Sequence, residues 1–374
     1  MEDEPVISVE DLKKRLDENK VEFILDLRNE DEFAAWHIEG HTDIDTANIP
    51  QVDFVGEEEK YLKDLPKDKQ IIAICAHGDS SRYTAELLKG SGFNAVSLKG
   101  GMDAWSEFYE IRMANSAPDV YQIYRVARGC LSYLIVSDEE AIAIDPCRHT
   151  GPIMSLANDL NVKITHVLDT HLHADHISGG REVAGKAGCR YCIHPDDVAG
   201  AKFDYTGLKD GQIITLGLDS FKVLHSPGHT PGSTSFLLDE KFLFSGDTIM
   251  KKSIGRPDLG GQAEKWAELL YATLFSHLAG LPDDTVVFPA HTISIREQDP
   301  DGPVALELGE ARRESELFQL RGIEKFIALV KSSLPQNPER YQQIRLLNLG
   351  EMTADEAKKK ELEIGKNLCG MAQK

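Results

Sequence analysis

Three histidines and one aspartate lie close together in the stretch His171-Leu172-His173-Ala174-Asp175-His176. In an extended chain every second side chain points the same way, so His171, His173 and Asp175 share one side. Neutral imidazoles and a carboxylate that converge in this manner suit zinc or iron. The stretch therefore predicts a metal site, and the alternative interpretation is a solvated polar loop.

More residues of the types that bind metals follow later in the chain. His229 comes after a Pro-Gly turn, Asp247 lies in a Ser-Gly-Asp-Thr stretch, and His291 follows a short apolar run. Each of them alone fits an ordinary polar loop. The ordered set of His, Asp and His after the first cluster favours one metal centre built from distant parts of the chain.

A second reactive group is Cys75, at the end of a predicted strand over residues 70–75 and before a predicted helix over 80–89. The loop reads Cys75-Ala76-His77-Gly78-Asp79-Ser80-Ser81-Arg82. Its backbone N–H groups can converge on one point, and the start of the helix adds positive potential. Such a loop either lowers the pKa of the thiol or cradles an anion bonded to the sulfur. The alternative is a cysteine packed as a small hydrophobic residue.

The elements around these residues indicate two α/β domains. In the first part, helices and strands alternate, as in a unit with a parallel sheet. The predicted elements there are a helix at 8–18, a strand at 21–27, a strand at 70–75, a helix at 80–89 and a strand at 96–98.

From residue 120 the pattern changes to short strands at close spacing, at 120–126, 131–136 and 141–144. Strands and helices then alternate, which suggests sheets inside and helices outside, and residues 304–349 are mostly helical. We expect four parts: a first domain at 1–110, a linker at 111–119, a second domain at 120–350 and a helical tail at 351–374.

Composition sets limits on the partners. The 374 residues are 41% hydrophobic and 28% charged, with a formal charge of −21. Such a charge disfavours nucleic acid and anionic membrane surfaces as partners. No apolar run reaches the roughly 20 residues of a membrane span. The acidic start lacks the features of a signal peptide, and the six scattered cysteines fit reduced thiols, so we expect a cytoplasmic protein.

Residues 5–108 resemble the rhodanese family of sulfurtransferases. The resemblance rests on Asp26-Leu27-Arg28, on His37-Ile38-Glu39-Gly40, on the Cys75 loop and on Gly100-Gly101-Met102. It implies that Cys75 carries a persulfide sulfur and that Ala76 to Arg82 cradle it. Ser80 stands where the family often has a basic residue, and Asp79 adds an acid. These departures favour a persulfide over thiosulfate as sulfur donor.

Residues 119–300 resemble the metallo-β-lactamase fold, an αββα sandwich. Two branches are similar: glyoxalase II-like thioesterases with two metals, and persulfide dioxygenases with one iron. The stretch from His173 to Gly179 and the stretch Gly255-Arg256-Pro257-Asp258-Leu259 look like the dioxygenase branch. The resemblance implies one Fe(II) per chain, held by His171, His229 and Asp247. The remaining residues would orient ligands or, in a hydrolase, hold a second zinc: His173, Asp175, His176 and His291.

Other residues of this half have expected roles by the same resemblance. Arg256 is a candidate for pairing with a substrate carboxylate, with an ordinary salt bridge as an equal alternative, and Thr230 is a second candidate contact for substrate. Ile293 stands where glutathione-using relatives tend to have tyrosine, which points to another thiol carrier, such as coenzyme A. Cys130 and Cys147 either relay sulfur or pack inertly, and packing is the favoured interpretation.

The two halves together predict sulfur oxidation in one polypeptide. A low-molecular-weight thiol persulfide, glutathione persulfide being the simplest example, would react with O₂ at Fe(II) to give sulfite and thiol. Cys75 would interconvert persulfide, sulfite and thiosulfate. The main alternative is a glyoxalase II-like thioesterase with two zinc ions, and another is a first domain that only docks partners. A homodimer is possible.

Overall fold

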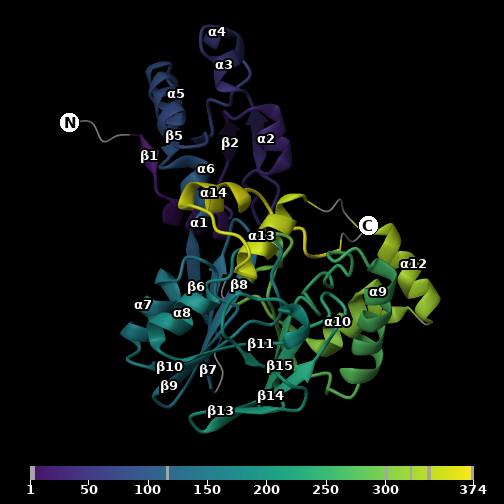
Figure 1. The fold of residues 1–374 in the computed structure, drawn as a ribbon. Helices are drawn as coiled ribbons and strands as arrows, with labels where there is room; N and C mark the ends of the chain where they lie inside the picture. Colours follow the sequence, from purple (N-terminus) through teal and green to yellow (C-terminus); the bar gives the residue numbers. More distant parts are fainter. Residues whose placement is uncertain (1–4, 115–117, 300–301, 321, 335–337, 372–374) are drawn as a thin grey trace. The chain divides into compact units, whose positions relative to one another are not determined.

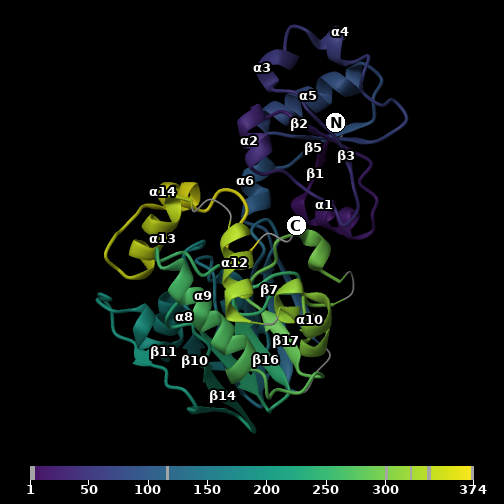
Figure 2. The same ribbon diagram turned by 90° about the vertical axis from the view of Figure 1, so that its right-hand side faces the viewer.

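The structure is a computed structural model that describes residues 5–114, 118–299, 302–320, 322–334 and 338–371 (Figure 1, Figure 2). The chain divides into two compact units. The first is residues 1–109 with the short segments 125–128 and 294–300, and the second is the rest.

The first unit is built on a five-stranded sheet in the order β1-β5-β4-β2-β3, and every neighbouring pair is parallel. The strands are β1 (Val6–Ile7), β2 (Phe23–Asp26), β3 (Asp45–Asn48), β4 (Ile71–Ile74) and β5 (Ala95–Leu98). All four residues of β4 are apolar and buried, as a strand covered on both faces requires. The predicted α/β unit with a parallel sheet is confirmed.

Helices accompany this sheet, and the two helices predicted in this part are present. Ser8 begins α1, where its side chain accepts a hydrogen bond of 3.1 Å from the N–H of Asp11. The helix after Cys75 is α5, and its apolar face packs in the core of the unit with residues of β2 and β4. The helices are α1 (Val9–Asp17), α2 (Glu30–Ala35), α3 (Gln51–Phe54), α4 (Glu58–Tyr61), α5 (Asp79–Gly90) and α6 (Gly101–Ser106).

The second unit contains two sheets. The seven-stranded sheet has the order β12-β11-β10-β9-β8-β7-β6, and the six-stranded sheet has the order β13-β14-β15-β16-β17-β18. The first sheet comprises β6 (Tyr109–Ala114), β7 (Asp119–Arg125), β8 (Cys130–Ser137), β9 (Glu140–Ile144), β10 (Lys163–Leu168), β11 (Arg190–Ile193) and β12 (Thr206–Gly207). The second comprises β13 (Ile213–Leu216), β14 (Asp219–His225), β15 (Thr234–Leu238), β16 (Phe242–Gly246), β17 (Val286–Pro289) and β18 (Leu306–Glu307).

The inner faces of the two sheets pack on each other, and helices cover the outer faces. Tyr133 of the first sheet meets Phe244 and Phe288 of the second, with ring centroids 5.1 and 5.7 Å apart. Figure 1 shows α7 (Gly151–Asp159) and α8 (Gly180–Ala187) beside β10 of the first sheet. A cluster of buried leucines joins the second sheet to the helices on its other side, and these are α9 (Ala263–Ala272), α10 (Leu308–Glu314) and α12 (Ile323–Ser332). The predicted αββα sandwich is confirmed.

The segment predicted as a linker differs from the expectation. Most of residues 111–119 belongs to β6 or begins β7, and these two strands are neighbours at the end of the seven-stranded sheet. Residues 115–117 lie outside the described residues. An edge strand buries little of its surface, so its polar composition resembles that of a linker.

The C-terminal part packs against the second unit. After α11 (Glu316–Gln319) and α12 come α13 (Arg340–Asn348) and α14 (Glu356–Leu362). Leu362 is buried with Ile177 and Ile344, so α14 of the predicted helical tail is part of the core of this unit. No helix within the described ranges is long and apolar enough to cross a membrane.

Candidate metal centre and cysteine loop

The predicted metal-binding residues lie in loops that begin where strands end. The His171–His176 stretch follows β10, His229 follows β14, Asp247 follows β16 and His291 follows β17. Strands β14 and β17 run parallel to β16, so their carboxyl ends lie at one edge of the second sheet. The topology therefore gathers residues that are more than a hundred positions apart in the chain.

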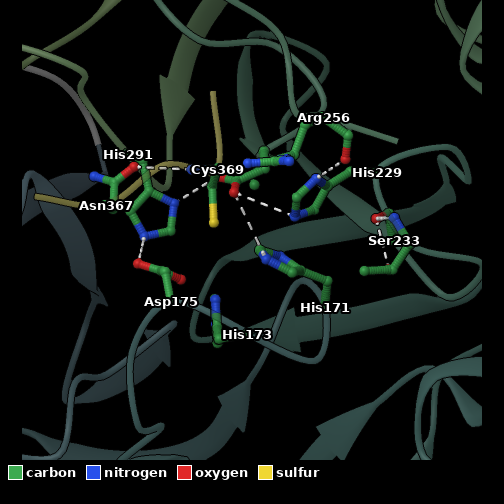
Figure 3. Close-up of polar contacts among 12 residues, drawn as sticks. His171, His173, Asp175, His229, Ser233, Arg256, His291, Asn367 and Cys369 are labelled. Carbon is green, nitrogen blue, oxygen red and sulfur yellow. Dashed lines mark hydrogen bonds and ion pairs between the residues drawn. The ribbon is translucent and has the colours of Figure 1, made fainter. Parts of the chain in front are cut away.

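His171, His229 and Asp247 present three ligand atoms to one another within 4.8 Å. The Asp247 Oδ2 atom lies 3.4 Å from His229 Nε2 and 3.8 Å from His171 Nε2 (Figure 3). The three residues are at most 2% exposed, and none of these three atoms has a hydrogen-bond partner. Buried polar atoms without partners are costly. Two histidines and one carboxylate on one side are the donor set of mononuclear Fe(II) oxygenases, so the group fits that metal.

Neighbouring groups fix the orientation of each of these side chains. His229 Nδ1 lies 2.9 Å from the carbonyl oxygen of Arg256, and this contact requires the proton on Nδ1 and a lone pair on Nε2. The Oδ1 atom of Asp247 lies 2.6 Å from His291 Nδ1, which leaves Oδ2 for the centre. His171 Nδ1 lies 2.9 Å from the hydroxyl of Thr170.

Burial sets the charge state of the two histidines. It lowers the pKa of His171 well below 6.5 and also lowers the pKa of His229. Burial alone would raise the pKa of Asp247, but the charge and hydrogen bond of His291 hold it below the usual value. The group therefore consists of two neutral imidazoles and one carboxylate, the states in which these side chains bind metals.

A second group of ligand-type residues lies beside the first. Its members are Cys130, Asp175, His176 and His291, all buried and with ligand atoms within 4.8 Å of one another. Asp175 Oδ2 lies 3.0 Å from His291 Nε2, and Asp175 Oδ1 lies 3.2 Å from His176 Nδ1. The sequence predicted the three side chains other than Cys130, and their roles as metal ligands or orienting groups stay a prediction.

His173 lies between the two groups, with its ring 4.2 Å from those of His171 and His176, and one of its ring nitrogens pairs with other carboxylates. Its Nε2 atom lies 3.2 Å from Asp145 Oδ1, and it forms a cluster with Asp145 and Asp169. Burial by itself lowers the pKa of His173, but Asp145 and Asp169 outweigh it and raise the pKa to about 9. Its Nδ1 atom is buried without a hydrogen-bond partner, and its role as an orienting group or second ligand stays a prediction.

Asp197, which the sequence did not single out, holds the loops of the centre together. Its carboxylate accepts hydrogen bonds from the N–H of Leu172, the hydroxyl of Thr230 and the N–H of Gly232, at 2.7–2.8 Å. Leu172 lies between two of the predicted histidines, and Thr230 follows His229. Thr230 thus supports the loop through Asp197, and its predicted contact with substrate remains a prediction.

The guanidinium of Arg256 is engaged within the protein. Two of its nitrogens lie 2.6 and 2.8 Å from the carboxylate of Asp258, and a third donates to the carbonyl oxygen of Leu368 at 3.2 Å. Arg256 is fully buried. Salt-bridge pairing was one of the two interpretations, and substrate binding by Arg256 would require it to exchange these partners.

Three cysteines of the second unit lie near the centre, and Cys130 and Cys147 have different neighbours. Cys130 lies 3.7 Å from Asp175 Oδ2, whereas Cys147 lies 3.7 Å from the hydroxyl of Ser132. A third, Cys369, is fully buried and faces Asp175 and Asp247. No local pattern in the sequence points to Cys369, because its place depends on a return of the chain after α14.

The Cys75 loop has the predicted geometry of N–H groups directed at the sulfur. The N–H groups of Gly78 and Ser81 lie 3.1 and 3.3 Å from Cys75 Sγ, and the Ser81 hydroxyl lies 3.2 Å from it. Gly101 packs so closely that an added Cβ would lie 2.3 Å from the Cys75 carbonyl oxygen. A thiolate or a sulfur-bonded anion would find donors here.

The other residues of the predicted cradle are less closely engaged with the sulfur. The side chains of His77, Asp79, Ser80 and Arg82 are exposed, and Ala76 is half-buried. His77 Nδ1 pairs with Asp103 at 2.6 Å. Their roles in sulfur binding stay predictions.

Comparison with known proteins agrees with the division of the chain into two domains. Residues 8–108 match the family of rhodanese-like domains, and residues 125–291 match the metallo-beta-lactamase superfamily. The human protein named persulfide dioxygenase ETHE1, mitochondrial, is 31% identical over 48% of this chain and 72% of its own length. A hydroxyacylglutathione hydrolase of Methylococcus capsulatus is 36% identical over 40% of this chain and 56% of its own length.

Two solved structures share the fold of the second unit. A metallo-beta-lactamase from Staphylococcus aureus superposes with a TM-score of 0.58, at 30% identity over 64% of this chain and 74% of its own. The structure of ETHE1 from Myxococcus xanthus gives a TM-score of 0.54, at 27% identity over 62% of this chain and 97% of its own.

Proposed function

The chain belongs to the metallo-beta-lactamase superfamily, with a rhodanese-like domain at residues 8–108 and persulfide dioxygenases among its relatives, and we propose that it oxidises persulfides. These relatives support an enzyme of sulfur metabolism that acts on small sulfur compounds. The finer proposal is a non-haem Fe(II) dioxygenase that converts a thiol persulfide and O₂ to sulfite and thiol, with a sulfurtransferase site at Cys75.

The observation that carries the proposal is the group of His171, His229 and Asp247. Its three ligand atoms are buried, lack partners and converge, and the donor set leaves positions for a substrate and O₂. Fe(II), when bound, would activate O₂ for transfer to the outer sulfur of the persulfide, and that sulfur would supply the electrons that reduce O₂. His291 positions Asp247, and the carbonyl oxygen of Arg256 holds His229 in the tautomer that can bind.

The loop at Cys75 supports the transfer of sulfane sulfur. The N–H groups of Gly78 and Ser81 stabilise negative charge at the sulfur atom or on a sulfur bonded to it. A persulfide on Cys75 can then give its outer sulfur to sulfite, which forms thiosulfate and returns the Cys75 thiolate. The reverse reaction would charge Cys75 from thiosulfate.

A dinuclear zinc thioesterase is the second candidate function. The group of Cys130, Asp175, His176 and His291 lies beside the first group, and a hydrolase is among the relatives. Two adjacent metal ions would activate a bridging water for attack on a thioester.

Metal replacement separates the two candidates. Metal-free protein is loaded with Fe(II) or with Zn(II), and each form is assayed for sulfite from glutathione persulfide and for cleavage of a glutathione thioester. The proposal expects sulfite from the iron form alone. Thioester cleavage by the zinc form, with no sulfite from the iron form, would replace the proposal with the hydrolase.

A further inference from the structure

The segment after α14 returns across the metal centre. The N–H of Arg256 donates to the carbonyl oxygen of Cys369 at 2.8 Å, and the N–H of Met371 donates to that of Ile254 at 3.1 Å. These bonds flank a β-bridge between Gly255 and Gly370. The segment therefore pairs with the chain that follows Asp247.

This return places a thiol inside the candidate metal centre. Cys369 is 0% exposed, its thiol is within hydrogen-bonding reach of Asp175, and Asp247 is near. In Figure 3 its sulfur lies in the middle of the labelled residues, with His291 and Asp175 on one side and His171 and His229 on the other. Cys369 thus faces both groups of ligand-type side chains.

Cys369 packs with buried Met250 and Trp266 and also borders the ligand-type side chains. The buried Nε2 atoms of His171 and His229 have no hydrogen-bond partners, and Figure 3 shows both rings on one side of the Cys369 sulfur. A cysteine that only packs would have apolar neighbours alone, whereas the Cys369 thiol is also within hydrogen-bonding reach of the Asp175 carboxylate.

The backbone on both sides of Cys369 is held by contacts with the rest of the unit. Leu368 N–H donates to the Tyr341 hydroxyl at 2.6 Å, and Asn367 donates to the Thr292 carbonyl oxygen at 3.1 Å. A Cβ added to Gly370 would lie 2.7 Å from the side chain of Ile293. Contacts on both sides of Cys369 therefore hold its position.

We propose that Cys369 is a sulfur-accepting residue of the metal centre, so that the persulfide oxidised there is attached to the protein. The proposal rests on the proposed function and names its immediate substrate. In the first step the Cys369 thiol attacks the outer sulfur of a low-molecular-weight persulfide. A new S–S bond forms on Cys369, the S–S bond of the donor breaks, and the proton of the Cys369 thiol passes to the donor sulfur, so that the donor leaves as its thiol.

The second step oxidises the sulfur that Cys369 received. The Cys369 persulfide, O₂ and one water give sulfite, two protons and the free Cys369 thiol. The outer sulfur is oxidised and O₂ is reduced, so atoms and electrons balance without another reactant. In this role the carrier thiol delivers sulfur and then leaves the site. The site therefore needs no residue that holds glutathione, in agreement with Ile293 at the position where glutathione-using relatives tend to have tyrosine.

The test uses the full chain, loaded with Fe(II) and kept free of O₂. Glutathione persulfide is added, the excess is removed, and the protein is unfolded, alkylated and digested for mass spectrometry. The peptide that contains Cys369 is expected to carry one additional sulfur, and this sulfur should leave as sulfite when O₂ is admitted. Cys369→Ser should lose this adduct and most of the oxygen uptake, whereas Cys189→Ser, at a half-buried thiol outside both groups, should keep both.

The outcomes separate this proposal from the proposed function. Absence of the adduct on Cys369, with oxygen uptake intact in wild type and in Cys369→Ser, would overturn the sulfur-accepting role and leave the dioxygenase. An adduct on Cys130 in place of Cys369 would also overturn it. If the adduct on Cys369 persists under O₂ and no sulfite forms, Cys369 accepts sulfur but the proposed dioxygenase function is wrong.

Discussion

His229 and Arg256 are joined by a hydrogen bond of 2.9 Å from the ring Nδ1 to the backbone carbonyl oxygen. The bond fixes the tautomer of His229 and directs Nε2 towards Asp247, 3.4 Å away. Gly255, next to Arg256, has its Cα so close to this ring that an added Cβ would lie 2.7 Å from Nδ1 and 2.5 Å from the Asp247 carbonyl oxygen. The packing of backbone against ring therefore sets the geometry of two predicted ligands.

Replacing Gly255 with alanine should displace His229 and weaken metal binding. Overpacking of this kind costs about 1–3 kcal/mol in the free energy of unfolding. Gly185→Ala is the control, because an added Cβ there meets no atom within 4 Å. Metal content after dialysis should fall in Gly255→Ala alone, and equal metal content in the two variants would contradict this account of the ring.

Asp197→Ala should loosen both loops that carry histidines. The change leaves the donors on Leu172, Thr230 and Gly232 without their acceptor, and we expect a loss of about 3 kcal/mol at roughly 1 kcal/mol per hydrogen bond. Chemical denaturation measures it. Asp196→Ala, at an exposed neighbour, should unfold as the wild type does, and a similar loss in both variants would rule out the specific role of Asp197.

Cys75→Ser should abolish the formation of thiosulfate from persulfide and sulfite, because the variant has no thiolate to carry sulfur. Oxygen uptake with glutathione persulfide should persist, since the two sites lie in different units. Ser80→Ala, in the same loop but exposed, is the control for folding. Thiosulfate formation that survives in Cys75→Ser would place the sulfurtransferase activity elsewhere.

The pair of His173 and Asp145 predicts a pH dependence of the metal-free protein. The folded pKa of about 9 lies above the ordinary 6.5, so the pair stabilises the protein fully below pH 6.5. This contribution, at most about 3 kcal/mol by linkage, is lost as the pH rises through about 9. Denaturation of wild type and Asp145→Asn across this range is the measurement. A difference in the free energy of unfolding between the two proteins that does not change with pH would contradict the pairing of His173 with Asp145.

The sequence predicted the fold and most of the site because both depend on local patterns. The His171–His176 stretch, the position of Cys75 before a helix and the alternation of elements can each be read within a short window. The partners of these residues cannot be read in the same way. Asp145 and Cys369 reach the centre through sheet pairing and through the return of the tail, which no local spacing encodes.

The polar strand β6 at the edge of the seven-stranded sheet also differs from the prediction. Strand β6 was interpreted as a linker because its pairing with β7 is invisible in composition. Arg256 shows the same limit at a single residue, because its buried pairing with Asp258 depends on how the loop closes. Local sequence thus predicted which ligand-type residues lie close together but not which groups hold them in place.

The most direct test is to count the metal in protein purified without O₂ and to follow O₂ consumption on glutathione persulfide in the same preparation. The account predicts about one iron per chain, as a mononuclear site requires, with persulfide-dependent oxygen uptake and release of sulfite. Asp247→Asn should lose both the iron and the uptake. About two zinc ions per chain with no oxygen uptake would contradict the account.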